Sequence, residues 1–334
     1  MTLQLLLSPA AVSRGTGREL GGARLGGGAP AVDWPEQAIS APLLGSTADS
    51  LRETWLADGP VSAGVSEGIA WRRAGDLLYG VVELAEAGFA GAGIPPLQAA
   101  SRAAYDRIFR LLDAQGLPCL WRVWNYLADI NGETHGLERY RQFNIGRQDA
   151  FLDYRRGTTG NVPAACAIGL AGGPLSIAFL AGPQPAVPVE NPRQVSAYHY
   201  PAEYGPRSPT FSRGALVHPP GQEILFVSGT ASIVGHRTVH PGDVAGQCRE
   251  SLANIAAVVA EANRVARSGD FSPDELVHRV YVREAADFPA VRAAFAELAG
   301  EAPGTVFVQA DICRADLLVE IEAMAVHPLA PTGR

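Results

Sequence analysis

The sequence contains no lysine, and all 27 of its basic residues are arginine. A Schiff-base nucleophile, an attachment point for pyridoxal phosphate and a phosphate-binding P-loop each need a lysine amine, so all three chemistries are excluded. Any anionic ligand must then be held by arginine, by backbone N–H groups or by hydroxyl groups. Arginine suits carboxylates in particular, because its planar fork binds both carboxylate oxygens at once.

Cysteine is also scarce. The four cysteines lie far apart in the sequence, at Cys119, Cys166, Cys248 and Cys313. No two of them form a CxxC pair, which argues against a structural zinc site, and disulfides are not expected in a cytoplasmic chain. His236 and His240 are four residues apart, but they fall in a turn with no third metal ligand nearby. The sequence therefore predicts neither a metal ion nor another cofactor.

Long apolar runs are missing as well. No run of about 18 apolar residues occurs, so no membrane span is predicted. The opening segment from Met1 to Leu7 is apolar but short, and no basic stretch precedes it, so we expect a cytoplasmic protein without a secretory signal. The net charge of −7 argues against nucleic acid as a partner, because phosphate binding needs a basic surface. With 334 residues, 47% of them hydrophobic, the chain can form two or three globular domains.

One order of elements, strand–strand–helix–strand–helix–strand–strand, is predicted twice along the chain. In the middle of the chain the elements are residues 68–72, 77–84, 95–112, 119–127, 137–151, 164–170 and 175–180. In the C-terminal part they are residues 215–217, 224–228, 244–266, 276–283, 288–298, 305–310 and 311–326. The pattern predicts an α+β fold of tandem domains, in which helices pack on one face of mixed sheets.

This repeat divides the chain into four segments. They are an N-terminal segment (1–60), a first α+β domain (61–190), a linker that can reach a pocket (191–204) and a second α+β domain (205–334). The N-terminal segment is predicted to hold one strand at residues 3–7 and otherwise glycine-rich loops. Its glycine-rich stretch 21–28 is not a dinucleotide-binding fingerprint, because no strand leads into it and no helix follows.

The last predicted strand, residues 311–326, places two carboxyls among apolar side chains. Side chains alternate between the two faces of a strand, so Val319 and Ile321 share one face. Glu320 and Glu322 lie on the other face. A carboxyl in apolar surroundings has a raised pKa, because burial disfavours its charged form, and it can then act as a general acid near neutral pH. The alternative is an edge or interface strand with solvated glutamates.

Polar residues also occur in other strands and in the linker. Arg122 and Tyr126 share one face of a predicted strand, with Asn125 on the other, and Arg283 ends a central strand of the second domain. A central strand between two helices favours a pocket position for Arg283. Solvent-exposed positions are the alternative for these arginines, since most arginines are exposed. Residues 196–213 contain three tyrosines, a histidine and two arginines, which favours a loop that lines a ligand site. The alternative is an ordered arm across the domain junction.

Two motifs of the second domain carry a family resemblance. Residues 226–236, with the sequence FVSGTASIVGH, and residues 317–323, LLVEIEA, resemble the reactive intermediate deaminase (RidA/YjgF) superfamily. The additional N-terminal copy, the segment 198–213 and the pair formed by Cys313 and Glu320 resemble the chorismatase family. Members of that family split chorismate into pyruvate and a benzoate-type acid. The resemblance covers most of the chain but little of its first 50 residues.

The resemblance implies a monomer with pseudo-threefold symmetry that mimics a RidA trimer, with the active site in a cleft between domains. Only two full repeats are evident in the sequence, so the third position is not accounted for. The arginine that simple RidA deaminases place upstream of the glutamate is absent, and Thr305 and Val306 occupy that region. This departure argues against imine deamination.

The resemblance also implies roles for individual residues. Glu320 is the acid that protonates the methylene carbon of the enolpyruvyl group, which gives an oxocarbenium ion that water or a neighbouring hydroxyl resolves. The arginines expected to bind the two carboxylates of chorismate are Arg283 and Arg147 first, then Arg207 and Arg122. The residues expected to line the pocket are Tyr198, Tyr200, Asn125, Tyr126, Ser228, Gly229 and Ala231.

Two products fit this chemistry. Intramolecular displacement leaves a hydroxybenzoate (the 3- or 4-isomer, or both), whereas hydrolysis leaves a dihydroxycyclohexadiene carboxylate. A thiol near the ring can shuttle a proton during aromatisation, so Cys313 favours hydroxybenzoate, while Ala231 resembles the hydrolytic type. Two other function classes stay open: a RidA-type imine or enamine hydrolase, and a non-catalytic binding module for small carboxylates.

Overall fold

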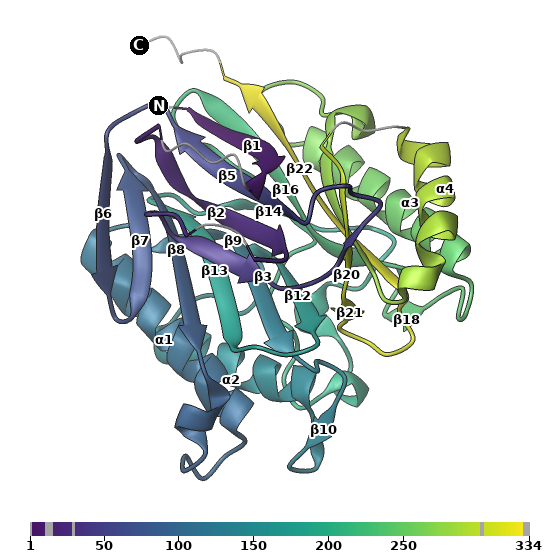
Figure 1. Ribbon diagram of the computed structural model, residues 1–334, viewed down its shortest axis with the longest axis horizontal. Coiled ribbons are helices and arrows are strands. Elements are labelled where there is room, and N and C mark those ends of the chain that lie inside the picture. Colours follow the sequence, from purple (N-terminus) through teal and green to yellow (C-terminus); the bar gives the residue numbers. More distant parts are fainter. Residues whose placement is uncertain (1, 11–15, 29–30, 301–303, 330–334) are drawn as a thin grey trace.

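The structure is a computed structural model that describes residues 2–10, 16–28, 31–300 and 304–329. Three β-sheets surround a shared apolar core, and helices cover the outer faces of two of them (Figure 1). All three sheets contribute to this core, where the rings of Trp55 and Trp124 both meet Phe226 edge to face. The predicted α+β fold, with helices on one face of each mixed sheet, is confirmed for the two sheets that carry helices, which belong to the middle and C-terminal units of the chain.

The middle of the chain forms a seven-stranded sheet. In spatial order its strands are β21 (Asp311–Ile312), β12 (Ala164–Leu170), β9 (Cys119–Ala128), β13 (Leu175–Gly182), β8 (Leu77–Leu84), β7 (Ile69–Ala74) and β6 (Val61–Ser66). Its helices are α1 (Pro96–Gln115) and α2 (Arg139–Asp153). Helix α1 begins at a proline, whose missing N–H would have no helical partner in the first turn, and Gly116, with φ +65°, caps its C-terminal end. The predicted order of elements is confirmed here.

The C-terminal sheet also has seven strands. They are β14 (Val187–Val189), β15 (Gly214–Val217), β16 (Gln222–Ala231), β22 (Val319–Pro328), β19 (Val277–Val282), β20 (Val306–Gln309) and β4 (Leu43–Leu44). Its helices are α3 (Val244–Asn263) and α4 (Phe288–Ala299). The side chain of Asp243 caps α3 by accepting a hydrogen bond from the Gly246 N–H at 2.9 Å. The alternation predicted along β22 is correct, because Val319 and Ile321 face the helices.

The prediction that residues 1–60 hold one strand and glycine-rich loops is wrong. The described part of this segment forms a four-stranded sheet in the order β1 (Leu3–Pro9), β5 (Ser50–Ala57), β2 (Glu19–Gly26) and β3 (Glu36–Ile39). The glycines of β2 are required by close packing. A Cβ atom added at Gly22 would lie 1.9 Å from the Glu53 carbonyl oxygen, and one at Gly21 would lie 2.1 Å from the Tyr79 ring. Such glycines resemble a loop in sequence because they show no alternation of side chains.

The three sheets repeat one arrangement of four strands. The sets β1–β5–β2–β3, β8–β13–β9–β12 and β16–β22–β19–β20 each have antiparallel neighbours except for the last pair, which is parallel. The N-terminal sheet therefore fills the third position of the pseudo-threefold arrangement that the family resemblance implies. The described residues of this segment include no α-helix, unlike the other two repeats, so the repeat is hard to recognise in the sequence.

Short strands cross between the sheets. Strand β21 leaves the C-terminal unit to pair with β12, and β4 leaves the N-terminal segment to pair with β20. Strand β14 lies before the predicted boundary at residue 190, but it pairs with β15, which lies after the predicted boundary at residue 204. Strands are therefore exchanged across the predicted boundaries at residues 60, 190 and 204. The prediction of one continuous strand over 311–326 is wrong, because residues 313–318 form a turn between β21 and β22.

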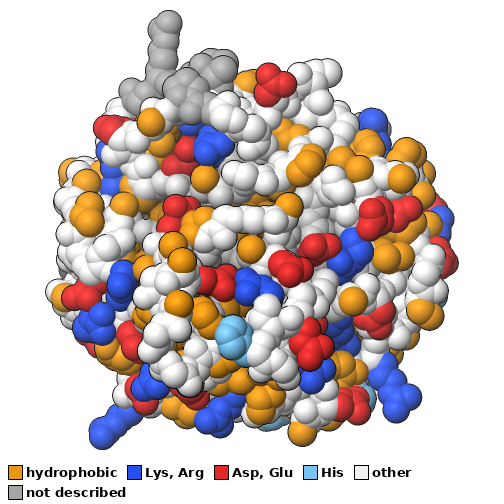
Figure 2. All heavy atoms as spheres, turned by 60° about the horizontal axis from the view of Figure 1, so that its bottom comes forward, with side chains coloured by type: hydrophobic (Ala, Val, Ile, Leu, Met, Phe, Trp, Pro, Cys, Tyr) orange, Lys and Arg blue, Asp and Glu red, His pale blue; other side chains and the backbone are white. Residues whose placement is uncertain are grey.

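The surface carries both signs of charge. Figure 2 shows acidic and basic side chains interspersed over the face that it presents. Within the described residues, no helix is both long enough and apolar enough to cross a membrane. The same part of the chain contains no group of three or more His, Cys, Asp or Glu side chains arranged to hold a metal ion.

Candidate active site

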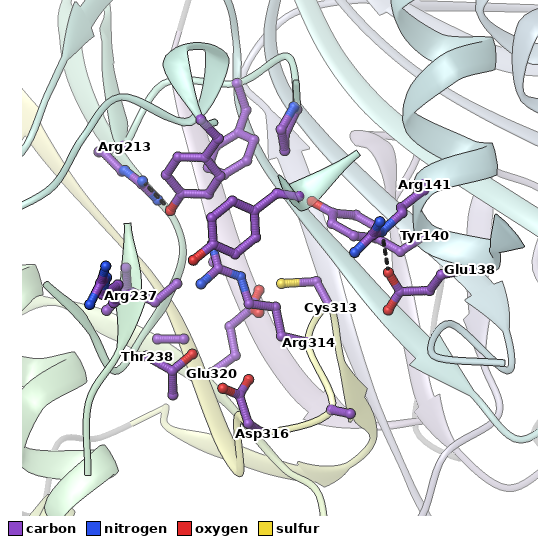
Figure 3. A pocket seen from close by; sticks show the side chains of 18 residues that line it. Glu138, Tyr140, Arg141, Arg213, Arg237, Thr238, Cys313, Arg314, Asp316 and Glu320 are labelled. Atoms are coloured by element: carbon purple, nitrogen blue, oxygen red, sulfur yellow. Dashed lines mark hydrogen bonds and ion pairs between the residues drawn. The ribbon is translucent and has the colours of Figure 1, made fainter. Parts of the chain in front are cut away.

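A cavity of about 440 Å³ lies at the junction of the middle and C-terminal sheets (Figure 3). Its lining comes from β22, the end of β16, the turn that follows β21, the beginning of α2, and the arm at residues 200–213. Two short hairpins contribute residues to it: β10 (Glu133–Thr134) with β11 (Leu137–Glu138), and β17 (Ile233–Val234) with β18 (Arg237–Thr238). A site of this size, with a few convergent polar groups, suits a small organic ligand.

Glu320 lines this cavity from β22. Its carboxyl lies directly over Gly229, where an added Cβ atom would be 1.8 Å from the Glu320 Oε1 atom. Room for the carboxyl is made by a bulge in β16, since the pairing with β22 shifts register between Val227 and Thr230. Burial, and then the neighbouring Glu322 carboxylate, raise the pKa of Glu320 to about 8. The side chain is therefore protonated at neutral pH and can donate a proton.

Glu322 has different surroundings, although it lies on the same face of β22. It forms ion pairs with Arg122 and Arg279 and accepts a hydrogen bond from the Tyr281 hydroxyl at 3.1 Å. Because three donors hold it, the negative charge of Glu322 stays fixed beside Glu320. One strand thus carries a paired carboxylate next to an acid that keeps its proton, an arrangement typical of active sites with carboxyl catalysis.

Four arginines border the cavity, namely Arg141, Arg213, Arg237 and Arg314. Arg213 donates hydrogen bonds to the Val195 carbonyl and to the Tyr200 hydroxyl, both at 2.7 Å. Its Nε atom is buried and has no hydrogen-bond partner among the described residues. A buried N–H without a partner is costly, so this arginine is suited to an anion that enters the cavity.

Arg314 is held by aromatic rings. Its guanidinium carbon lies 4.0 Å from the centre of the Tyr204 ring, and it donates a hydrogen bond to the His236 carbonyl at 2.9 Å. Its Nη2 atom, and the hydroxyl of Thr238 nearby in the lining, are buried and lack partners in the described part of the chain. In Figure 3 the side chains of Glu320, Cys313 and Arg314 lie between Arg213 and Asp316. The cavity therefore places cationic and polar groups around Glu320. Glu138, which pairs with Arg141 at 3.1 Å, and Asp316 add two further carboxyls to the lining.

The turn at residues 313–318 is fixed by Arg283. This guanidinium donates hydrogen bonds to three backbone carbonyls of the turn and its flanks, at 2.9 to 3.1 Å, and pairs with Asp311 at 2.6 Å. In a continuous strand these backbone carbonyls would accept hydrogen bonds from a neighbouring strand. Here they accept hydrogen bonds from Arg283 instead, which explains the break between β21 and β22. The turn brings Cys313 into the cavity, where burial and then the Glu320 carboxyl raise the thiol pKa to about 12. The thiol is therefore neutral.

The structure brings together five of the residues selected from the sequence. Those that line the cavity are Glu320, Cys313, Tyr200, Gly229 and Ala231. Ala231 is paired with Glu320 across strands β16 and β22, so its methyl group lies beside the acid. The arm at 196–213, which was expected to line a ligand site, contributes Tyr200, Tyr204 and Arg213.

The four arginines selected as carboxylate ligands lie outside the lining of this cavity. Arg122 pairs with Glu322, and Arg283 holds the turn at residues 313–318, as described above. Arg147 is buried on α2, where it donates to the side-chain amide of Asn144 at 2.8 Å. Arg207 pairs with Asp149 at 3.3 Å and is largely exposed. Carboxylate binding by these residues stays a prediction, while the geometry favours Arg141, Arg213, Arg237 and Arg314.

Four other selected residues also lie outside the lining. Asn125 is hydrogen-bonded within the middle unit, and Tyr126 meets the Tyr281 hydroxyl at 2.6 Å in the core. The Ser228 hydroxyl links backbone groups on either side of the junction between the two sheets. Tyr198 lies on the arm beside the ring of its neighbour in the sequence.

Sequence reasoning missed several residues of the lining. These are Glu138, Tyr140, Arg141, Arg237, Thr238, Arg314 and Asp316. They lie in short hairpins, at the beginning of a helix and in a turn, where no periodic pattern indicates which side chains face inward. Arg314 follows Cys313 directly, and an arginine next to a suspected site residue is the signal that could have identified it.

Comparisons with known proteins agree with this architecture. Residues 53–181 match the family model described as "Chorismatase FkbO/Hyg5-like, N-terminal", and residues 210–327 match "Endoribonuclease L-PSP". A chorismatase from Streptomyces rapamycinicus is 42% identical over 284 residues, which cover 83% of this chain and 82% of that protein. A 3-hydroxybenzoate synthase from Streptomyces hygroscopicus is 37% identical over 311 residues, covering 89% and 88%.

A solved structure gives the same result for the fold. The crystal structure of a chorismatase matches with a TM-score of 0.87 at 35% identity, covering 97% of this chain and 98% of the other. The match includes the N-terminal sheet, whose relation to the family the sequence motifs did not reveal. Identity at this level over most of both chains confirms the resemblance seen in the two motifs. The chain belongs to the chorismatase family.

Proposed function

We propose that the protein cleaves the enolpyruvyl ether of chorismate and releases pyruvate and a hydroxybenzoate, with Glu320 as the proton donor. The observation that carries this proposal is a buried, protonated Glu320 in a cavity bordered by four arginines. Chorismate has two carboxylates, which arginine binds well, and an enol ether that reacts when its methylene carbon is protonated. Relatives named chorismatase and 3-hydroxybenzoate synthase support the same chemistry.

The proposed reaction begins with transfer of the Glu320 proton to the methylene carbon. The electrons of the C=C bond form the new C–H bond, and the ether carbon becomes an oxocarbenium ion. The bond between the ring and the ether oxygen then breaks, its electrons go to that oxygen, and pyruvate leaves. The neighbouring ring hydroxyl attacks the ring carbon and gives its own proton to the Glu320 carboxylate, which forms an arene oxide and restores the acid. Opening of the arene oxide, with loss of a ring proton, yields hydroxybenzoate without net addition of water.

Cys313 supports the aromatising outcome. Its thiol lines the same cavity as Glu320 and stays protonated, so it can pass a proton to or from the ring as the arene oxide opens. Ala231 favours the hydrolytic alternative, in which water attacks the oxocarbenium ion and a dihydroxycyclohexadiene carboxylate results. Both residues border the same acid, so the two outcomes share their first step.

A single incubation tests the proposal. Purified protein and chorismate are expected to give pyruvate, measured with lactate dehydrogenase, and an equimolar aromatic acid, separated by chromatography against authentic 3- and 4-hydroxybenzoate. Dihydroxycyclohexadiene carboxylate in place of the aromatic acid would identify the hydrolytic alternative. Absence of pyruvate at every pH tested would refute chorismate cleavage.

The pH dependence should report the protonation of Glu320. Its pKa is raised to about 8, and only the protonated form can donate, so kcat/KM is expected to be constant below that value. Above it, kcat/KM should fall about tenfold for each further pH unit. The thiol of Cys313 titrates near 12 and does not contribute to this fall. A rate that increases as the pH passes through 8 would contradict the assignment.

A further inference from the structure

A buried cluster of four charges lies where the three sheets meet. Glu322 of the C-terminal sheet pairs with Arg122 of the middle sheet, and with Arg279 at 3.0 Å. Arg279 also forms an ion pair with Glu53, which comes from β5 of the N-terminal sheet. Neither arginine side chain is more than 6% exposed, so solvent screens these charges weakly. Two carboxylates and two guanidinium groups make the cluster electrically neutral.

The pairing of strands identifies equivalent positions in the repeated sheets. In the C-terminal sheet, Glu320 pairs with Tyr281, and Tyr281 pairs with Val308 of the parallel strand. Val308 precedes Ile312 by four residues, and Ile312 lies in the short strand that crosses to the middle sheet. These three relations fix the position of the catalytic acid within its repeat.

The same three relations hold in the N-terminal sheet. Leu51 pairs with Leu25, Leu25 pairs with Ile39, and Ile39 precedes Leu43 of the crossing strand β4 by four residues. Leu51 therefore occupies the position of the catalytic acid. Glu53, two residues further along, occupies the position of the paired carboxylate. The N-terminal repeat thus has a leucine in place of the acid but has the supporting carboxylate, and that carboxylate pairs with an arginine of the C-terminal sheet.

The charge of this cluster acts on Glu320 through Glu322, its neighbour on the same face of β22. If Glu53 were neutral, two guanidinium groups would face one carboxylate, and the excess positive charge would favour the ionised form of Glu320. We propose that Glu53 is a positioning residue for the catalytic acid: its pairing with Arg279 keeps the buried cluster neutral, so that Glu320 retains its proton beside an anionic substrate. This inference rests on the proposed role of Glu320. It assigns the N-terminal sheet a chemical role at a site that this sheet does not line.

Other titratable and charged groups also face the two carboxyls. Around Glu320 they are Glu322, Arg122, Arg213, Cys166, Cys313 and Tyr140. Around Glu53 they are Arg279, Arg122, Glu322, His278 and Tyr79. Burial raises the pKa of both thiols and both tyrosines, and it lowers the pKa of His278 to about 4. These five groups are therefore neutral near pH 7 and do not obscure the titration of Glu320.

Infrared spectroscopy can follow the protonation of Glu320 without substrate, through the carboxylic C=O band that is lost in the Glu320→Gln variant. In the unchanged protein the band is expected to disappear with a midpoint of about 8. Glu53→Gln should lower this midpoint by about one unit, whereas Arg279→Met, which removes a cation, should raise it by a similar amount. The double variant is neutral again and should return to about 8. A loosened fold would shift the midpoint of Glu320 in the same direction in both single variants, so shifts of opposite sign exclude that explanation. Each single variant also tests the proposal separately, because the direction of its shift is specified.

The matched control is Glu36→Gln. Glu36 lies in the same sheet, pairs with Arg24 and Arg52, and has a side chain 12% exposed, against 14% for Glu53. This variant should leave the midpoint of Glu320 unchanged. An unchanged midpoint in the Glu53 and Arg279 variants would overturn the inference about Glu53. The proposed role of Glu320 as proton donor would still stand in that case. A midpoint near the ordinary value of 4.5 in the unchanged protein would instead overturn the role of Glu320 itself.

Discussion

Replacement of Glu320 by glutamine is expected to lower kcat for pyruvate release by about 10²–10⁴-fold, the range typical for loss of a general acid. Glutamine has nearly the same size and shape, so it fills the space over Gly229 but has no proton of suitable acidity to transfer to carbon. The measurement is a single-turnover assay of pyruvate at pH 7, which excludes effects on product release.

Two controls separate this effect from a loss of structure. The melting temperature of Glu320→Gln should stay within a few degrees of the unchanged protein, because the substituted acid is already neutral in the folded state. Binding of a non-reactive aromatic dicarboxylate should also persist, since the arginines of the cavity are untouched. Turnover within a factor of three of the unchanged protein would remove Glu320 from the proposed mechanism.

Replacement of Gly229 by alanine is expected to lower kcat by about 10²-fold, because a displacement of about 1 Å at a reacting group has an effect of this size. The added methyl group would lie 1.8 Å from Glu320 Oε1 and 3.2 Å from Cys166 Cβ, so the carboxyl must move out of its position. Overpacking should also lower the free energy of unfolding by about 1–3 kcal/mol. Steady-state kinetics and urea denaturation measure the two effects.

The matched control for that substitution is Gly172→Ala. An added Cβ atom at Gly172 meets no heavy atom within 4 Å, and the backbone there does not have a positive φ. Activity and stability should therefore match those of the unchanged protein. Equal losses in the two variants would show that the effect at position 229 is not caused by contact with Glu320.

Periodicity in the sequence predicted the elements that have a strong alternating or helical pattern. The four central strands and two helices of each domain follow the predicted order, and the alternation along residues 319–326 correctly places Glu320 and Glu322 opposite the helix-facing side chains. That pattern also selected the residue on which the proposed chemistry depends. Apolar and polar side chains alternate along such a strand because each of its two faces has its own environment, and this pattern can be read directly from the sequence.

The sequence could not reveal contacts between sheets. Arg283 was selected for a pocket because it ends a central strand, but its guanidinium is directed to the turn beside it by several backbone carbonyls. Arg314 and Arg237 lie in a turn and a hairpin whose side-chain directions depend on tertiary packing. The N-terminal strands escaped recognition because glycines such as Gly22 leave no pattern, although they are required by the approach of another strand.

The exchanged strands β21 and β4 have a consequence for folding. Each connects its own unit to the edge of a neighbouring sheet through backbone hydrogen bonds, so the units cannot separate without exposing unpaired N–H and C=O groups. In a trimer of separate chains, dissociation at low concentration would take apart a cavity that is formed between two of its sheets. Here the tethered strands make the assembly of that cavity an intramolecular event, and its integrity is independent of dilution.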